Sequence, residues 1–456
     1  MREYIWNYLH GSETVDPLAD SMRAQILQAP DRVPAAGTTY YFSSVNGNDS
    51  NDGKSPKTAL RTPERVADLP LQPDDAVLFE RGSEFRLTQG ILLTSGVYYG
   101  AYGQGEKPKF IGSAHNYGRS GCWTACDTEH IWQMTYAYAQ PGQIIVNDGE
   151  LVGNRLFDRQ ALRQDGDYYF DKNSCIIYLY SDTDPNTYER MEISCGGNGF
   201  GGKDVRNVTV ENLWLQHFGC HGIGFWMADH VTVRHCVFRW IGGDVQRPTT
   251  DDITRLGNAV EFYDTSNNIT VEDNWIYQIY DTGITFQGTQ GPFTNIQFNN
   301  NLIEYCVMGI EYWCGNKQQA MRAVFDGNIL RFSNYGWGTL PDRVARGGHL
   351  WAGWRLLETN KEIDIVIRNN VFDCSYSYVF SCPWKRPEVC GQTYTFEGNS
   401  YYMRNRIDEK GGFGVDVNMA FFFGPDAVRS QANDQAELEA AVKAVDPHAK
   451  EIRWLD

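Results

Sequence analysis

The chain has 456 residues, of which 42% are hydrophobic and 14% aromatic, and its formal net charge is −17 at pH 7. This charge argues against nucleic acid or an anionic membrane surface as a partner, and a neutral partner that stacks on aromatic rings fits better. No apolar run approaches the roughly 18 residues of a membrane span, and residues 1–25 lack the apolar stretch of a signal peptide. The 11 cysteines include no CxxC pair, so we expect reduced thiols in a cytoplasmic protein.

The first part of the chain is expected to form three units. Residues 1–36 are an N-terminal extension, with a helix around "LADSMRAQILQ" (18–28). Residues 37–114 carry short β-patterned runs and would form an N-terminal cap with the first turns of a larger strand structure. Residues 115–196 would form an inserted β-rich subdomain.

The central residues 197–405 repeat one sequence pattern, as in "VTVENLWLQHFGCHGIGFW" (208–226). Each repeat has a short β-patterned run, then a polar corner and then a second apolar run. The corner positions recur at steps of about 23 to 42 residues. They are Leu213, Cys236, Asn274, Asn301, Asn328, Asn370 and Asn399. This pattern is typical of a parallel β-helix, in which a corner Asn tolerates left-handed backbone geometry and bonds to its stacked neighbours. An antiparallel sandwich is the alternative, but few two-residue hairpin turns are present.

Residues 406–456 are expected to close the last coil. The stretch "DQAELEAAVKAV" (434–445) has helical spacing and a charged face. Because an open coil end is an exposed sheet edge, a cap is physically required.

Two parts of the chain, residues 40–113 and 144–185, resemble segments of a known family. "YYFSSVNGNDSNDGKSPKTALRTPERVADL" (40–69), with "DDAVLFERGSEFR" (74–86) and "GVYYGAYGQGEKPKFIGS" (96–113), resembles the opening of right-handed β-helix carbohydrate-active proteins. "IIVNDGELVGNRLFDRQALRQDGDYYFDKNSCIIYLYSDTDP" (144–185) resembles a small β-rich insertion of several β-helix glycoside hydrolases. The resemblance implies an all-β fold, a right-handed parallel β-helix (solenoid) with an inserted β subdomain and helical terminal segments. It implies carbohydrate chemistry, because related coils host hydrolases, lyases and epimerases.

The last strands of successive coils align in one register. Strand alternation directs Ile223, Val260, Ile284 and Ile310 inward, with the residues two further on. The first outward row, which we expect to face solvent, is then Gly224, Glu261, Thr285 and Glu311. The second outward row is Trp226, Tyr263, Gln287 and Trp313. Glu261 and Glu311, two coils apart, should have Cα atoms about 9–10 Å apart. Asp281 lies at the corner that enters the coil between them.

Two insertions interrupt the repeat at comparable places, "GDVQRPTTDDITRL" (243–256) and "NYGWGTLPDRVARGGHLWAG" (334–353). Both loops should leave the same side of the coil, one on each side of two compact turns. They would then wall a groove whose floor holds Glu261, Asp281, Thr285 and Glu311.

Glycoside hydrolysis needs one protonated and one ionised carboxyl group. Glu261, Asp281 and Glu311 are the catalytic candidates, with Asp251 and Asp252 in reserve. The alternative for each is a solvated surface carboxylate on the coil.

Sugar hydroxyls and rings require polar and aromatic partners. The candidates for substrate binding are Trp226, Tyr263, Gln287, Trp313, Arg255, Arg346, His349 and Arg355. A solvated basic loop is the alternative for Arg343, Arg346, His349 and Arg355. Packing under loops is the alternative to sugar stacking for Trp226, Tyr263, Trp313, Trp337 and Trp351, and we favour stacking for Trp226 and Trp313 only. His217 and His221 have the spacing of a helical metal pair but lie in a strand and a turn, so we expect no metal and no cofactor.

We therefore expect a cytoplasmic glycoside hydrolase that acts on a small, neutral oligosaccharide through two carboxyl groups. The runner-up is a lyase or epimerase acting on a uronic-acid glycan, with His349 and Arg346 as its base. A non-catalytic carbohydrate-binding protein is the third interpretation. The oligomeric state is left open, with a homo-oligomer as one option.

Overall fold

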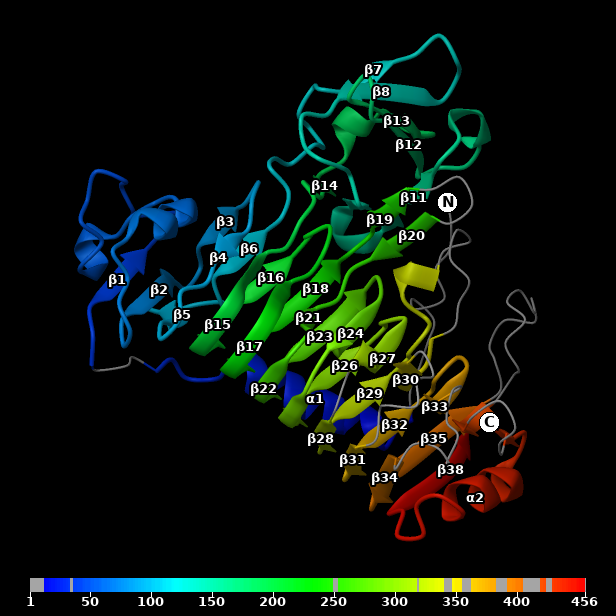
Figure 1. Cartoon of the computed structure of the whole chain (residues 1–456). Helices are drawn as coiled ribbons and strands as arrows, with labels where there is room; N and C mark the ends of the chain where they lie inside the picture. Colours follow the sequence, from blue (N-terminus) through cyan, green and yellow to red (C-terminus); the bar gives the residue numbers. More distant parts are fainter. Residues whose placement is uncertain are drawn as a thin grey trace.

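The computed structural model describes residues 12–32, 36–248, 253–317, 320–339, 347–354, 362–382, 392–404, 419–423 and 429–455. Parallel strands stack along one axis, with β1 at one end of the stack and β38 at the other (Figure 1). The right-handed parallel β-helix expected from the repeat is confirmed, and the antiparallel sandwich is excluded by the parallel pairing of successive coils. No helix in the described residues is long and apolar enough to span a membrane.

Three strand faces surround the core. The first face contains β21 (Val260–Tyr263), β24 (Thr282–Gln290), β27 (Met308–Lys317), β30 (Leu350–Trp354), β33 (Tyr378–Cys382) and β36 (Met419–Phe423). The second face contains β22 (Ser266–Glu272), β25 (Phe293–Asn299), β28 (Met321–Asp326), β31 (Ile363–Arg368) and β34 (Gln392–Glu397). The long strands β15 (Phe200–Glu211) and β17 (Ile223–Arg234) extend over both of these faces, since β17 pairs with β21 and with β22.

The third face is a separate parallel sheet. It contains β3 (Glu84–Arg86), β6 (Lys109–Ile111), β16 (Trp214–Gln216), β18 (Val237–Ile241), β23 (Trp275–Ile279), β26 (Leu302–Glu304), β29 (Ile329–Arg331), β32 (Val371–Asp373), β35 (Ser400–Arg404) and β38 (Glu451–Leu455). The N-terminal coils add β1 (Thr39–Phe42), β2 (Ala76–Glu80), β4 (Ile91–Leu92) and β5 (Tyr98–Tyr102).

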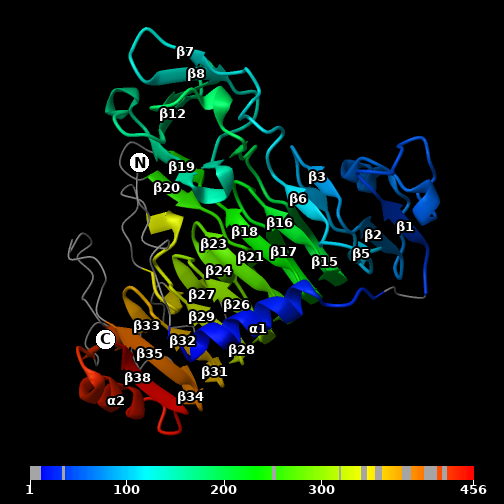
Figure 2. The same cartoon turned by 180° about the vertical axis from the view of Figure 1, so that it is seen from behind.

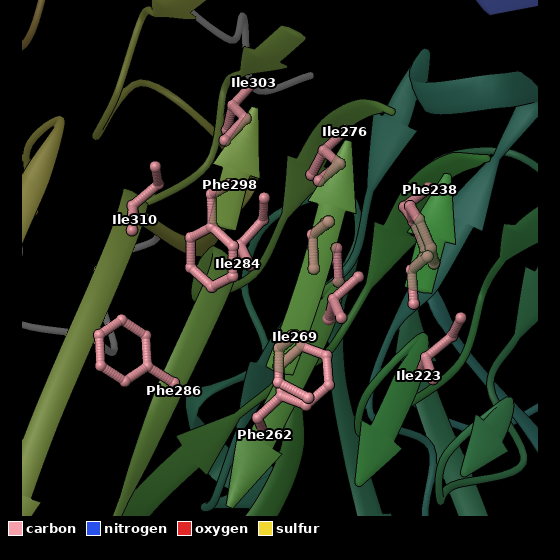
Figure 3. Close-up of a cluster of buried hydrophobic side chains, with 14 of the residues drawn as sticks. Ile223, Phe238, Phe262, Ile269, Ile276, Ile284, Phe286, Phe298, Ile303 and Ile310 are labelled. Carbon is pink, nitrogen blue, oxygen red and sulfur yellow. The ribbon is translucent and has the colours of Figure 1, made fainter. Parts of the chain in front are cut away.

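The interior is filled by rows of side chains at alternate strand positions. Figure 3 shows Ile223, Ile284 and Ile310 pointing into this core together with Phe262 and Phe286. The rings form stacks along the axis. Those of Phe225 and Phe262 are 5.1 Å apart at an interplanar angle of 9°, and those of Phe286 and Tyr312 are 5.6 Å apart at 15°. The predicted inward register is therefore confirmed.

An asparagine ladder runs along the corner before the third face. The backbone N–H and side-chain amide of Asn274 both donate to Oδ1 of Asn301, and Asn301 bonds in the same way to Asn328. The expectation of left-handed backbone at the Asn itself is wrong, because the residue before it adopts that geometry, as at Asn300 (φ 51°) and Asn369 (φ 55°). The ladder asparagine is thus free to point its amide inward and bond to the next coil.

Helices and short strands cover the coil at its side and its end. Helix α1 (Val15–Leu27) lies across the outer surface of the third face, where it buries Val15, Ala19 and Ile26 (Figure 2). At the C-terminal end, β37 (Arg429–Gln431) pairs with β36, and α2 (Gln435–Lys443) buries Leu438 and Val442 in the main core. The helices lie within the terminal segments where we expected helical structure.

The inserted subdomain has a core of its own, including Trp123, Tyr136 and Tyr168. One sheet contains β7 (Thr124–Ala125), β8 (Ile131–Thr135), β11 (Asn154–Leu156), β12 (Asp167–Asp171) and β13 (Ile176–Tyr180). The other contains β9 (Ile144–Val146), β10 (Leu151–Val152) and β14 (Met191–Ile193).

Three insertions leave the same corner of the coil, the one that joins a third-face strand to the next first-face strand. The subdomain lies between β6 and β15, the hairpin β19 (Asp244–Pro248) and β20 (Ile253–Leu256) lies between β18 and β21, and the second loop lies between β29 and β30. We call the described segments 217–222, 242–248, 253–259, 280–281, 305–307, 332–339 and 347–349 the long corner. The prediction that both loops leave one side of the coil is confirmed.

Candidate active site

The outward register of the first face is as predicted. Glu261 pairs with Gly224 on one side and with Thr285 on the other, and Thr285 pairs with Glu311. The second outward row, Trp226, Tyr263, Gln287 and Trp313, pairs in the same sequence. The two glutamates are therefore separated by two strand spacings, with Thr285 between them.

The first outward row is not solvated, which corrects our expectation that it faces solvent. Glu261 is 7% exposed, Thr285 0% and Glu311 9%. The hydroxyl of Thr285 is buried and has no hydrogen-bond partner within the described part of the chain. Two covered carboxyl groups with an unsatisfied hydroxyl between them are costly in a merely structural surface.

Glu261 accepts hydrogen bonds at both oxygens. Nε2 of His221 lies 2.7 Å from Oε2, Nδ2 of Asn258 donates to Oε2 at 3.0 Å, and Nε2 of Gln287 donates to Oε1 at 3.2 Å. Burial alone would raise the pKa of Glu261, but His221, with the two amides, outweighs burial and lowers that pKa below its ordinary value. Glu261 is therefore held as a carboxylate.

Asn258 and Thr282 connect this carboxylate to the second glutamate. The side-chain oxygen of Asn258 accepts from the backbone N–H of Thr282 at 3.0 Å. The Thr282 hydroxyl in turn donates to Oε2 of Glu311 at 3.0 Å. A continuous hydrogen-bonded chain thus runs from Glu261 to Glu311 along the edge of the long corner.

Asp244, at the start of β19, is a buried carboxyl that the sequence analysis did not select. Its Oδ2 accepts from the N–H of Gly197 at 2.9 Å, and its Oδ1 has no partner in the described part of the chain. A Cβ at Gly219 would lie 2.2 Å from Oδ1, so only glycine allows this approach. Burial raises the pKa of Asp244 to about 6, although Gly197, two buried arginines and His221 act in the opposite direction.

Asp281 lies at the long corner on the coil of Thr285, as expected. Its backbone N–H donates to the carbonyl of Gly257 in the preceding coil, and its carbonyl accepts from Met308 in the next. Its side chain is half-buried. The neighbouring Tyr280 packs with Trp240 and Trp337 and with two residues of the inserted subdomain, so all three insertions meet beside Asp281.

The second outward row is more open than the first. Trp226 is 48% exposed, while Tyr263, Gln287 and Trp313 are half-buried. The Nζ of Lys203 lies 5.0 Å from the centre of the Trp226 ring. The exposed indole of Trp226 offers an aromatic surface of the kind on which a sugar ring can stack.

The structure places two of the basic residues predicted to bind substrate, Arg255 and His349, and both are buried. Arg255 is buried and donates to the carbonyls of Gly243 at 2.8 Å and Gly142 at 2.9 Å, so it ties the hairpin to the inserted subdomain. His349 is fully buried, bonded to the hydroxyl of Ser333 and packed on Phe372, and burial lowers its pKa to about 3. This interior position is incompatible with the sugar contact expected of His349.

Other candidates lie outside the described residues. These are Arg343, Arg346, Arg355 and the reserve pair Asp251 and Asp252. In the sequence, the reserve pair falls between β19 and β20, the two strands of the hairpin that begins with Asp244. No group of three His, Cys, Asp or Glu side chains in the described part of the chain could hold a metal ion.

Asp244, His221 and Asn258 were missed as site residues for a common reason. Each lies on the long corner, where no strand alternation predicts the direction of a side chain. His221 was considered only as a metal ligand with His217, which is instead buried near Glu192. A usable signal was the position of Asp244 near the start of an insertion, directly after two glycines.

A family model described as right handed beta helix region matches residues 167–329. A lacto-N-biosidase of Bifidobacterium longum subsp. longum is 24% identical over 307 residues, which are 59% of this chain and 18% of that protein. The chain thus spans about a fifth of the length of this curated relative.

Solved structures also match. A GH136 lacto-N-biosidase from Eubacterium ramulus has a TM-score of 0.52 and 16% identity, covering 96% of this chain and 69% of the other. The pectate lyase Pel9A has a TM-score of 0.44 and 13% identity, covering 88% and 78%. The resemblance to right-handed β-helix carbohydrate-active enzymes is confirmed, and at these identities it establishes the fold.

Proposed function

We propose that this chain is a glycoside hydrolase that cleaves a glycosidic bond in a small, neutral oligosaccharide. One observation carries the proposal. Two buried carboxyl groups near His221 have pKa values that their surroundings move in opposite directions, that of Asp244 upward to about 6 and that of Glu261 downward. Such a separation is the physical basis of acid and base roles in one site.

In this proposal Asp244 is the proton donor and Glu261 is the ionised carboxylate. The proton on Asp244 passes to the oxygen of the leaving sugar as the glycosidic bond breaks. Glu261, held by His221 and two amides, acts on the anomeric side as base or nucleophile. Glu311 and Asp281 remain candidates for the same roles, since Glu311 is buried in register with Glu261 and Asp281 lies at the adjoining corner.

The same face offers contacts for a sugar. The exposed ring of Trp226 can stack on a pyranose face, and Tyr263 and Trp313 continue its row along the axis. The net charge of −17 favours a neutral sugar over a polyanionic one.

The proposed substrate and compartment draw on the relatives and the cysteines. Lacto-N-biosidase is the name of the similar proteins from both bacteria, so glycosides of lacto-N-biose are the first substrates to test. Nine cysteines whose side chains the structure describes form no disulfide, which supports action in the cytoplasm on an imported oligosaccharide.

The test is a screen of aryl glycosides and short neutral oligosaccharides, followed by four variants. We expect release of reducing sugar, and losses of about 10²–10⁴-fold in kcat/KM for Asp244→Asn and Glu261→Gln. Glu311→Gln and Asp281→Asn examine the other candidates. Asp364→Asn, an exposed carboxylate of β31, is the matched control and should leave the rate unchanged.

Three results would contradict the proposal. A product that absorbs as an unsaturated uronate would indicate a lyase, although the buried His349 can no longer serve as its base. Binding of sugar by the wild type without turnover would indicate a binding protein. Full activity in both Asp244→Asn and Glu261→Gln would mean that the hydrolytic site lies elsewhere.

A further inference from the structure

The contacts of His221 define the protonation of both its ring nitrogens. Nδ1 accepts a hydrogen bond from the backbone N–H of Asn258 at 3.1 Å. Nε2 lies 2.7 Å from Oε2 of Glu261. A nitrogen that accepts an N–H carries no proton of its own, so the ring proton is on Nε2 and points at the carboxylate.

We propose that His221 is a positioning residue that acts through Glu261, and that Asn258 locks it in the neutral Nε2–H tautomer. Asn258 performs both tasks with different atoms. Its backbone N–H selects the tautomer, while its side-chain Nδ2 donates to the same Oε2 that His221 contacts. Oε1 is held separately by Gln287.

Glycine at position 224 makes room for this arrangement. Gly224 is the residue that pairs with Glu261 on the preceding coil, in the same outward row. A Cβ there would lie 2.6 Å from Nδ2 of Asn198 and 3.4 Å from Cδ2 of His221. Oδ1 of Asn198 accepts from the backbone N–H of His221 at 3.2 Å, so the imidazole is held from the main chain as well.

Several titratable groups of the described chain act on His221. They are Glu261 on β21, Asp244 on β19 and the adjacent Cys220. Burial lowers the pKa of His221, whereas Cys220 and Glu261 raise it well above its ordinary value. The N–H of Asn258 opposes protonation, since a proton on Nδ1 would face another donor at 3.1 Å. The geometry thus favours a hydrogen bond from a neutral ring over an ion pair. In this tautomer His221 lowers the pKa of Glu261 as a hydrogen-bond donor and not as a cation.

The inference rests on the proposed role of Glu261, and two substitutions separate positioning from simple structural support. In His221→Gln the side-chain amide can still reach Glu261 as a donor. In His221→Asn the side-chain oxygen can accept from Asn258, but no donor reaches Glu261. His230→Asn, on the same strand β17 with its side chain 59% exposed, is the control and should behave as wild type.

We expect His221→Asn to lower kcat/KM about 10²-fold, mainly through kcat, because the carboxylate loses its orientation. The acidic limb of its pH profile should move to higher pH, since Glu261 loses a donor that lowers its pKa. His221→Gln should keep activity within about 10-fold of wild type, with the limb near its original position. Equal losses in both variants with no movement of the limb would overturn the inference.

A second measurement does not depend on turnover. In protein labelled with ¹⁵N at histidine, the signal lost in His221→Asn identifies the ring, and we expect an unprotonated Nδ1 and a protonated Nε2 from about pH 5 to about pH 8. Protonation of both nitrogens in this range would overturn the inference even in an active hydrolase. If the wild type hydrolyses no sugar, the proposed function fails while this measurement still decides the tautomer.

Discussion

Trp226 and Asp264 belong to neighbouring coils, and the indole N–H of Trp226 donates to Oδ2 of Asp264 at 3.2 Å. The ring also meets Tyr263 edge-on, with centres 6.1 Å apart at an interplanar angle of 89°. The indole is therefore fixed in orientation although about half of its surface is exposed. A rigid, exposed ring can bind a flat ligand face with little loss of side-chain entropy.

Replacement of this ring tests its role in binding. We expect Trp226→Ala to raise KM about 10-fold, equivalent to about 1.4 kcal/mol, with kcat nearly unchanged, because stacking acts equally on substrate and transition state. Trp226→Phe should keep most of the affinity. Leu92→Ala removes another exposed apolar side chain, 77% accessible, and should have no effect. A fall in kcat at constant KM would assign Trp226 to the chemistry instead.

The raised pKa of Asp244 makes an activity prediction. A general acid must be protonated, so kcat/KM should fall as pH rises above about 6, the pKa to which burial raises Asp244. The measurement is the pH profile of hydrolysis with a neutral substrate. An alkaline limb that survives in the residual activity of Asp244→Asn would show that another group titrates there.

The same carboxyl predicts how stability depends on pH. The folded pKa of about 6 exceeds the unfolded value of about 3.9, so the folded state binds more protons in this window and stability decreases as pH rises through it. Asp244→Asn removes this contribution. Its free energy of unfolding relative to wild type should be constant below about pH 4 and should rise by about 3 kcal/mol by about pH 7. Parallel urea titrations of the two proteins would measure it, and a constant difference across the window would contradict the assignment.

The asparagine ladder predicts a large and local loss of stability. Oδ1 of Asn328 accepts both the backbone N–H and the side-chain amide of Asn301, and its own Nδ2 donates to the carbonyl of Phe298. We expect Asn328→Ala to cost about 2–4 kcal/mol, because buried donors and an acceptor lose their partners. Urea denaturation is the measurement. Asn173→Ala, at an exposed position, should change stability by less than about 0.5 kcal/mol.

At the C-terminal end of this ladder, Asp446 makes a prediction about stability that a matched pair of Asp→Asn substitutions can test. Asp446 is fully buried and accepts from the backbone N–H groups of Gly398 and Asn399, the amide of Asn399 and the hydroxyl of Tyr401. We expect Asp446→Asn to destabilise by about 1–3 kcal/mol, since its NH₂ would face donors. Asp434→Asn, at the exposed N-cap of α2, should be nearly neutral because Asn caps equally well. Hydrogen exchange at β35 would locate the loss, and equal effects of the two substitutions would contradict this account.

The fold was predictable from the sequence to a large extent. The corner residues Asn274, Asn301 and Asn328 recur in the sequence, and they stack in space because each coil repeats the same chain path. The outward direction of Glu261 followed from strand alternation, which is a local property with a period of two residues. The left-handed geometry was assigned one residue too late, since the repeat marks the corner without resolving which residue turns the chain.

The candidate site was predictable only in part. Glu261 and Glu311 were placed correctly in one outward row, but their burial depends on chain segments that pack over that row. His349 appeared to be a loop residue by sequence position, and the fold places it inside the coil. The partnership of Asp244 and His221 near Glu261 joins residues on different coils and on a hairpin, and no periodic pattern relates them.

The sequence by itself therefore determined the coil, its register and the corner from which the insertions leave, because alternation and repetition are written along the chain. Only the tertiary structure decided which carboxyl groups are buried, which donors reach them and which way their pKa values move. Those properties depend on distances of about 3 Å between atoms of segments that are far apart in sequence. Strand alternation leaves the corner residues undetermined, and the chemistry we propose lies where the coil departs from its own repeat.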